Sequence, residues 1–200
     1  MFRWSLLAIA YASMAAVAFA ICEFGLGRSV WLHPDPWLGL QGIPAHAYSL
    51  VFGVAIGALC VMLTRRLVEK VAWAQELARV LRPFARGMSG TGILVVAALS
   101  SVGEELLFRG LLQPWLGVIG QAIVFGVVHQ MPGPSRWAWM LWATVIGVLF
   151  GVIFVSTGSL VGPLVAHALI NGLNLNFLQS YDPEPSRRSL GGLFGTTARP

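Results

Sequence analysis

The chain has 200 residues, of which 56% are hydrophobic and 10% are charged. Ordinary soluble domains carry about 25% charged residues, so this composition excludes a soluble globular protein. Apolar runs of about 20 residues, the length of a bilayer-spanning helix, recur along the chain and indicate an all-α, polytopic membrane helix bundle. The net charge of +5 does not indicate a nucleic-acid partner, because no basic patch alternates with aromatic residues.

The apolar runs predict about six transmembrane helices, and one basic segment predicts an additional interfacial helix. The expected spans cover residues 4–24, 45–63, 89–112, 116–129, 137–155 and 160–178. Pro34, Pro36 and Pro44 break the chain between the first two spans. Residues 64–87 combine apolar and basic residues at helical spacing, which is typical of an amphipathic helix on the membrane surface. Between the third and fourth spans, we expect the chain to turn at Gln113–Trp115.

This map divides the chain into four regions. They are two N-terminal spans (1–63), an amphipathic connector (64–88), a core of four spans (89–178) and a flexible tail (179–200). The sequence Ala18–Ala20 resembles a signal-peptide cleavage site. Because the first apolar run is longer than that of a usual signal peptide and continues past Ala20, we favour a retained span.

Basic residues predict the orientation in the membrane, because cytoplasmic loops carry an excess of Lys and Arg. With both termini in the cytoplasm, every Lys and Arg except Arg28 and Arg109 falls on the cytoplasmic side. We therefore expect an integral membrane protein with its N-terminus and C-terminus inside. The small size and this charge sorting favour the inner membrane of a bacterium.

Three ionisable residues lie inside the third expected span, where charge is costly and usually functional. Glu105 and Arg109 are four residues apart, so they share one face of a helix and can pair. Glu104 points about 100° away from Glu105 and must face another partner. The sequence therefore predicts a structural Glu105–Arg109 pair and a second carboxylate, Glu104, that is available as a general base.

Two later spans each carry a histidine that lies one helical turn from another candidate site residue. Phe125 precedes His129 by four residues, and His167 precedes Asn171 by four residues. A single histidine in a membrane helix is more often a helix–helix contact than a catalyst. Three spans with polar groups on one face favour their convergence in one interior site.

These residues resemble the three motifs of the CPBP intramembrane proteases, the CAAX-processing and bacteriocin-processing enzymes that are also called the Abi family. The motifs are EExxxR, FxxxH and HxxxN, in that order, and all three match over residues 89–178. The resemblance implies peptide-bond hydrolysis at the membrane. Glu104 with His129 would activate the attacking water, and His167 with Asn171 would stabilise the oxyanion.

The resemblance also implies supporting roles for Glu105, Arg109 and Phe125. It leaves the cofactor open, because the family has been described both as metal-free glutamate proteases and as metalloproteases. A divalent metal such as zinc would use Glu104, His129 and His167 as ligands. We favour the metal-free mechanism, because the chain has no HExxH motif and an amide is a poor zinc ligand.

The expected partners are the lipid bilayer and a membrane-associated or hydrophobic peptide or protein substrate. The residues leave open whether that substrate is prenylated. A different class of function also fits the buried polar cluster. A small proton-coupled transporter, or a non-proteolytic immunity or scaffold protein, could use the same residues. Substitution of Glu104 would abolish cleavage in a protease and flux in a transporter, and it would spare a scaffold.

Overall fold

A computed structural model describes residues 4–131 and 133–181 of the chain. The described residues form helices and no sheet, which confirms the predicted all-α class. The elements are α1 (Trp4–Ala20), η1 (Ile21–Gly25), α2 (Gly42–Lys70), α3 (Ala72–Arg86), α4 (Gly90–Glu105), η2 (Leu106–Leu112), α5 (Gln113–Val128), α6 (Arg136–Thr157) and α7 (Val161–Ser180). Most of the expected tail, residues 182–200, lies outside the described residues.

The described part of the chain contains five helical runs that are long and apolar enough to cross a membrane. They are Ser5–Gly25, Gly42–Lys70, Gly90–Val128, Arg136–Thr157 and Val161–Ser180. The number is one below the expected six because the third and fourth expected spans form one 39-residue run. This run bends sharply within α5, at Gly117, so that its two arms take up the places of two expected helices.

The bend at Gly117 corrects the predicted turn at Gln113–Trp115. Gly117 has φ 69° and ψ 176°, a conformation that side-chain-bearing residues avoid. Pro114 lies at the start of α5, where a missing N–H is tolerated. Pro114 has no N–H to donate to the preceding turn. The carbonyls of Gly110 and Leu111 in that turn accept hydrogen bonds from the Arg28 guanidinium at 2.8 and 3.2 Å.

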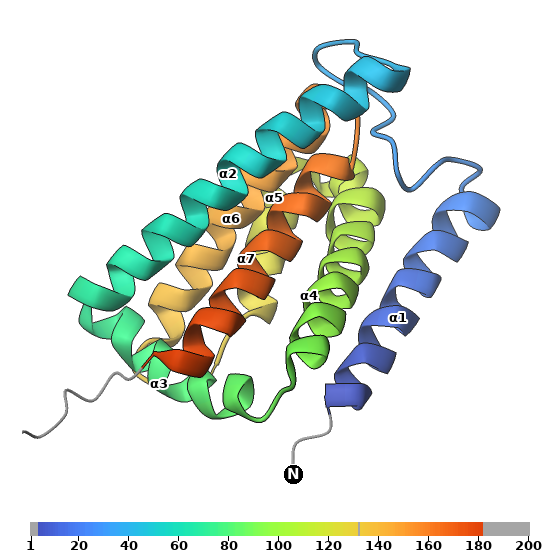
Figure 1. The fold of residues 1–200 in the computed structure, drawn as a ribbon. Helices are drawn as coiled ribbons and strands as arrows, with labels where there is room; N and C mark the ends of the chain where they lie inside the picture. Colours follow the sequence, from blue (N-terminus) through green and yellow to red (C-terminus); the bar gives the residue numbers. More distant parts are fainter. Residues whose placement is uncertain (1–3, 132, 182–200) are drawn as a thin grey trace, which may run out of the picture.

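The helices form a bundle with a core and an outlying helix (Figure 1). Figure 1 shows α2, α6 and α7 side by side, with α4 between α7 and α1. The start of α1, the whole of α3 and the end of α7 lie at one end of the bundle. At the other end, the loop after η1 packs against the α6–α7 turn, where the Trp37 amide donates to the Val155 carbonyl at 2.8 Å.

The amphipathic segment is shorter than expected and begins later. Helix α2 continues to Lys70, and the extended backbone of Val71 (φ −123°, ψ 123°) separates it from α3. The apolar face of α3 packs on the end of α7, with Ala74 and Ala78 buried in one cluster with Leu178. On its other face, Arg79 pairs with Glu76 near solvent at 2.6 Å. Helix α3 therefore covers one end of the bundle.

Candidate active site

The bend at Gly117 brings the motif that contains Glu104 next to the motif that contains His129. Gly117 lies thirteen residues after Glu104 and twelve before His129. At 1.5 Å per residue, one arm rises by about 20 Å and the other returns by about 18 Å. His129 Nε2 accordingly lies 3.5 Å from Glu104 Oε2.

Glu105 and Arg109 form the closed half of the polar cluster. Arg109 Nη1 donates to Glu105 Oε1 at 2.9 Å, and both side chains have no exposed surface. Arg109 also donates to the Gly147 carbonyl at 3.3 Å, and its guanidinium lies 4.4 Å from the centre of the Phe125 ring. Such additional contacts offset the cost of burying a charge pair, although Glu105 Oε2 and Arg109 Nε are buried without a hydrogen-bond partner among the described residues. The geometry is that of a structural clamp between helices.

His167 connects the two glutamates. Its Nδ1 lies 2.7 Å from Glu105 Oε1, and its Nε2 lies 3.7 Å from Glu104 Oε2. Because Glu105 is ionised by its pairing with Arg109, we assign a hydrogen to His167 Nδ1, which donates to that carboxylate. The Nε2 atom of the neutral ring is then a hydrogen-bond acceptor.

His129 has the same tautomer for a different reason. Its Nδ1 lies 2.7 Å from the carbonyl oxygen of Phe125, which can only accept a hydrogen bond. Nδ1 therefore carries a hydrogen, and Nε2 of the neutral ring is an acceptor. The Phe125 ring packs against the His129 imidazole, with 4.2 Å between the ring centres.

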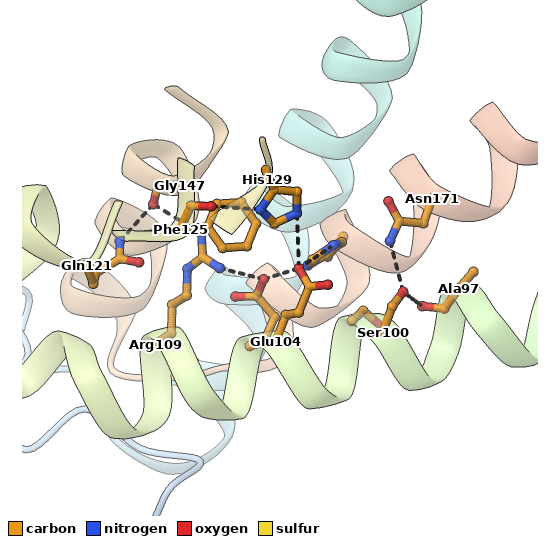
Figure 2. Close-up of polar contacts among 12 residues, drawn as sticks. Ala97, Ser100, Glu104, Arg109, Gln121, Phe125, His129, Gly147 and Asn171 are labelled. Atoms are coloured by element: carbon orange, nitrogen blue, oxygen red, sulfur yellow. Dashed lines mark hydrogen bonds and ion pairs between the residues drawn. The ribbon is translucent and has the colours of Figure 1, made fainter. Parts of the chain in front are cut away.

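Glu104 forms the open half of the cluster (Figure 2). Figure 2 shows its carboxylate facing His129, with Arg109 and Asn171 on opposite sides of it. Its Oε2 atom is buried and has no hydrogen-bond partner within the described protein. The two facing Nε2 atoms are also acceptors in the neutral rings. Three acceptors facing one another require a hydrogen from elsewhere, supplied by an added proton or by a donor such as water.

Asn171 lies beside this group rather than within it. Its Nδ2 donates to Ser100 Oγ at 2.9 Å, and Ser100 donates to the Ala97 carbonyl at 3.3 Å. Figure 2 shows Asn171 to one side of the Glu104–His129 group, beside Ser100. The structure thus brings Glu104, His129 and His167 together and holds Asn171 nearby through α4.

Tyr11 in α1 is a site residue that the sequence analysis missed. Its hydroxyl lies close enough to the Glu104 side chain to interact with it electrostatically. A Cβ atom at Gly103 would lie 2.7 Å from the Tyr11 carbonyl oxygen, so the glycine permits this approach of α1 to α4. Gln121 was also missed; it donates to the Gly147 carbonyl, which it shares with Arg109. An isolated tyrosine or glutamine in an apolar run carries no motif that could have identified it.

The structure does not identify the alternative metal site of Glu104, His129 and His167 as such. Within the described ranges, no group of three or more His, Cys, Asp or Glu side chains is arranged to hold a metal ion. Glu105 Oε1 and the Phe125 carbonyl engage the Nδ1 atoms of His167 and His129, and both Nε2 atoms are directed at Glu104 Oε2. The reaction proposed below uses protein groups and water.

Comparisons with known proteins match part of the chain to a family and to a relative. Residues 88–173 match the family model described as Type II CAAX prenyl endopeptidase Rce1-like. The uncharacterized protein YpbD of Bacillus subtilis (strain 168) is 32% identical over 81 residues, which are 40% of this chain and 42% of that protein. The chain thus aligns with less than half of this relative's length. No solved structure gives a significant match. Residues 88–173 form a domain of the Rce1-like type II CAAX prenyl endopeptidase family, also known as CPBP or Abi.

Proposed function

We propose that this integral membrane protein is an intramembrane endopeptidase that hydrolyses a peptide bond in a membrane-associated or hydrophobic peptide. The observation that carries the proposal is the buried, unpartnered Oε2 of Glu104, which faces the Nε2 atoms of His129 and His167. A water molecule bound there would find the Glu104 carboxylate as a strong acceptor.

The charges of the cluster support this role. Glu104, Glu105 and Arg109 together carry one net negative charge when both carboxyl groups are ionised. A net charge inside a membrane bundle is costly. One added proton, shared among Glu104, His129 and His167, makes the cluster neutral. The site therefore holds a proton that can be donated in a hydrogen bond to a developing oxyanion.

The proposed reaction uses this proton directly. A water between Glu104 and His129 attacks the carbonyl carbon and gives one proton to Glu104, the general base. The added proton resides on His167, whose Nε2–H donates to the developing oxyanion together with Asn171 Nδ2–H. A donor of this kind contributes about 2.7–4 kcal/mol in well-studied enzymes. The oxyanion then re-forms the carbonyl, the C–N bond breaks, and the proton on Glu104 passes to the leaving nitrogen.

The orientation with both termini in the cytoplasm remains part of the proposal. Helix α3, with its basic residues, lies at one end of the bundle. The start of α1 and the end of α7 lie at the same end. His129 ends α5 on the same side, because α3 and the segment after His129 line one small pocket. The active site would then open toward the cytoplasmic leaflet, in a bacterial inner membrane. The division into 1–63, 64–88, 89–178 and 179–200 is likewise a proposal, in which the helix of the connector is α3.

The substrate class to test first is the one in the family's description, a prenylated peptide with a CAAX sequence. The experiment compares the termini of membrane proteins by mass spectrometry in cells that carry the wild-type chain or Glu104→Gln. Glu69→Gln, an exposed carboxylate paired with Arg66, is the matched control. We expect one or a few proteins to retain an additional terminal segment with Glu104→Gln only. Identical termini at equal expression would contradict proteolysis and favour a transporter or a scaffold.

A further inference from the structure

A cavity of about 230 Å³ lies next to the catalytic cluster. Tyr11, Ser100 and Asn171 line it at the catalytic end, and Trp139 extends from there to within 6.2 Å of the His129 ring, centre to centre. Its other walls come from the apolar face of α3 and the end of α7. No Asp, Glu, Lys or Arg is among its lining residues. The lining of the cavity is therefore uncharged, and the cavity adjoins the site at Asn171.

Two polar side chains in this cavity have no partner. Thr64 Oγ1 and Asn174 Oδ1 are buried, and neither makes a hydrogen bond to another described residue. The hydroxyl of a threonine inside a helix commonly bonds to a carbonyl in the preceding turn, as Thr157 does with Ile153 at 2.7 Å. Buried polar atoms normally have a partner, so these two require an explanation.

Asn174 continues the polar face of α7 that begins in the active site. His167, Asn171 and Asn174 follow at spacings of four and three residues, which place them on one side of a helix. The rise from His167 to Asn174 is about 10 Å, which matches about three residues of an extended peptide. The unpartnered atoms thus lie at the distance of a short peptide segment from the proposed reaction centre.

We propose that this cavity binds the apolar segment of the substrate next to the cleaved bond, in an extended conformation. A backbone N–H about three residues from that bond donates to Asn174 Oδ1, and the Thr64 hydroxyl donates to a backbone carbonyl. The uncharged lining selects small apolar side chains and rejects charged ones, because a charge buried there has no partner. This assignment rests on the proposed peptidase function and adds the feature of the substrate that the site recognises.

A lipid acyl chain is the competing occupant. It would fill the apolar walls, but it has no donor for Asn174 and no acceptor for Thr64. A peptide satisfies both the walls and the two polar atoms, so the observations favour a peptide.

The test uses a photo-reactive probe and the Glu104→Gln chain in lipid nanodiscs, so that binding is measured apart from cleavage. The probe is an N-acetylated, C-amidated hexapeptide of Leu and Val with one photo-leucine. Mass spectrometry of the labelled chain should place the cross-links on cavity residues of α3 and α7, such as Leu77, Leu81 and Leu175. An Asp in the middle of the probe should reduce labelling about tenfold.

Asn174→Leu should also reduce labelling about tenfold, because it removes the acceptor and keeps a similar volume. Asn176→Leu is the matched control, since Asn176 lies two residues away on the same helix and is exposed outside this cavity. Thr64→Val is a second, nearly isosteric variant that should weaken labelling in the same direction. Equal labelling of the Asn174 and Asn176 variants, or cross-links outside the cavity, would overturn the proposal.

A photo-reactive fatty acid that labels the same residues and displaces the hexapeptide would assign the cavity to lipid, and so would also overturn it. The outcome is separable from the peptidase function. Cavity labelling with no detectable hydrolysis by the wild-type chain would contradict only the peptidase. Hydrolysis of the cellular substrate at equal rates by the wild-type and Asn174→Leu chains would contradict only the binding assignment.

Discussion

The two halves of the polar cluster differ in the groups that face their carboxylates. Glu105 and Arg109 have no exposed surface and contact each other, a histidine and a backbone carbonyl. Glu104 is the adjacent residue on the same helix, and its Oε2 faces two imidazoles, of which the nearer, that of His129, is 23% exposed. The closed half fixes helix positions, and the open half leaves acceptors for a substrate or water. Adjacent, chemically identical side chains thus differ in role through their surroundings.

The largest expected effect concerns the closed half. Arg109→Met should lower the free energy of unfolding by about 3–5 kcal/mol, because it leaves Glu105 buried without a counter-charge. Arg79→Met removes an ion pair near the surface and should change it by about 0–1 kcal/mol. Thermal unfolding of the purified chains in detergent measures both. Equal stability of the two variants would contradict the role of Arg109 as a clamp.

The position of the open half depends on the packing of α5 against α6. Gly126→Ala should destabilise the protein by about 1–3 kcal/mol and displace His129, three residues later. A Cβ there would overlap Thr144 Oγ1 and lie 2.8 Å from the Met140 carbonyl oxygen. Gly172→Ala is the control, since its Cβ would meet only Ala97 Cβ at 3.6 Å. Thermal stability and peptide cleavage should both be impaired more by Gly126→Ala than by Gly172→Ala. Equal stability and equal cleavage rates of the two variants would refute the packing argument.

A smaller effect is expected at the margin of the open half. Ser100→Ala removes the acceptor that holds Asn171 and should cost about 0.5–1.5 kcal/mol of stability. It should also lower the cleavage rate if Asn171 must be held for the oxyanion. Ser101→Ala is the neighbouring control, because the Ser101 hydroxyl donates within α4 to the Ala98 carbonyl. A Ser101 variant as impaired as the Ser100 variant would indicate that α4 itself is disturbed.

The smallest expected effect is that of metal removal. Cleavage by the purified chain should not change after treatment with a zinc chelator, because the proposed steps use only protein groups and water. The assay compares activity before treatment, after treatment and after addition of zinc. Loss of activity that only zinc restores would show that the open half is a metal site instead.

The sequence predicted the charged core better than the fold around it. The pairing of Glu105 with Arg109 follows from their four-residue spacing, and the different direction of Glu104 follows from helix geometry. Apolar runs predicted the helices, because hydropathy reports which segments suit a bilayer. The motif residues were also found from their spacing on single helices.

The bend and the contact with α1 could not be predicted in the same way. Pro114 and Gly117 are both compatible with a turn, and only the tertiary structure determines that the chain bends at Gly117. Tyr11 reaches Glu104 because Gly103 lets two helices approach, a contact between residues far apart in the chain. Such contacts leave no periodic pattern within one segment.

The central claim is that Glu104 acts in catalysis whereas Glu105 holds the structure. The most direct test measures thermal unfolding and substrate cleavage for Glu104→Gln and Glu105→Gln side by side. We predict that Glu104→Gln keeps the melting temperature of the wild-type chain and slows cleavage by about 10²–10⁴-fold. We predict that Glu105→Gln lowers the melting temperature strongly, because it leaves Arg109 buried without its counter-charge. The opposite pattern, with a stable Glu105 variant or an active Glu104 variant, would contradict the account.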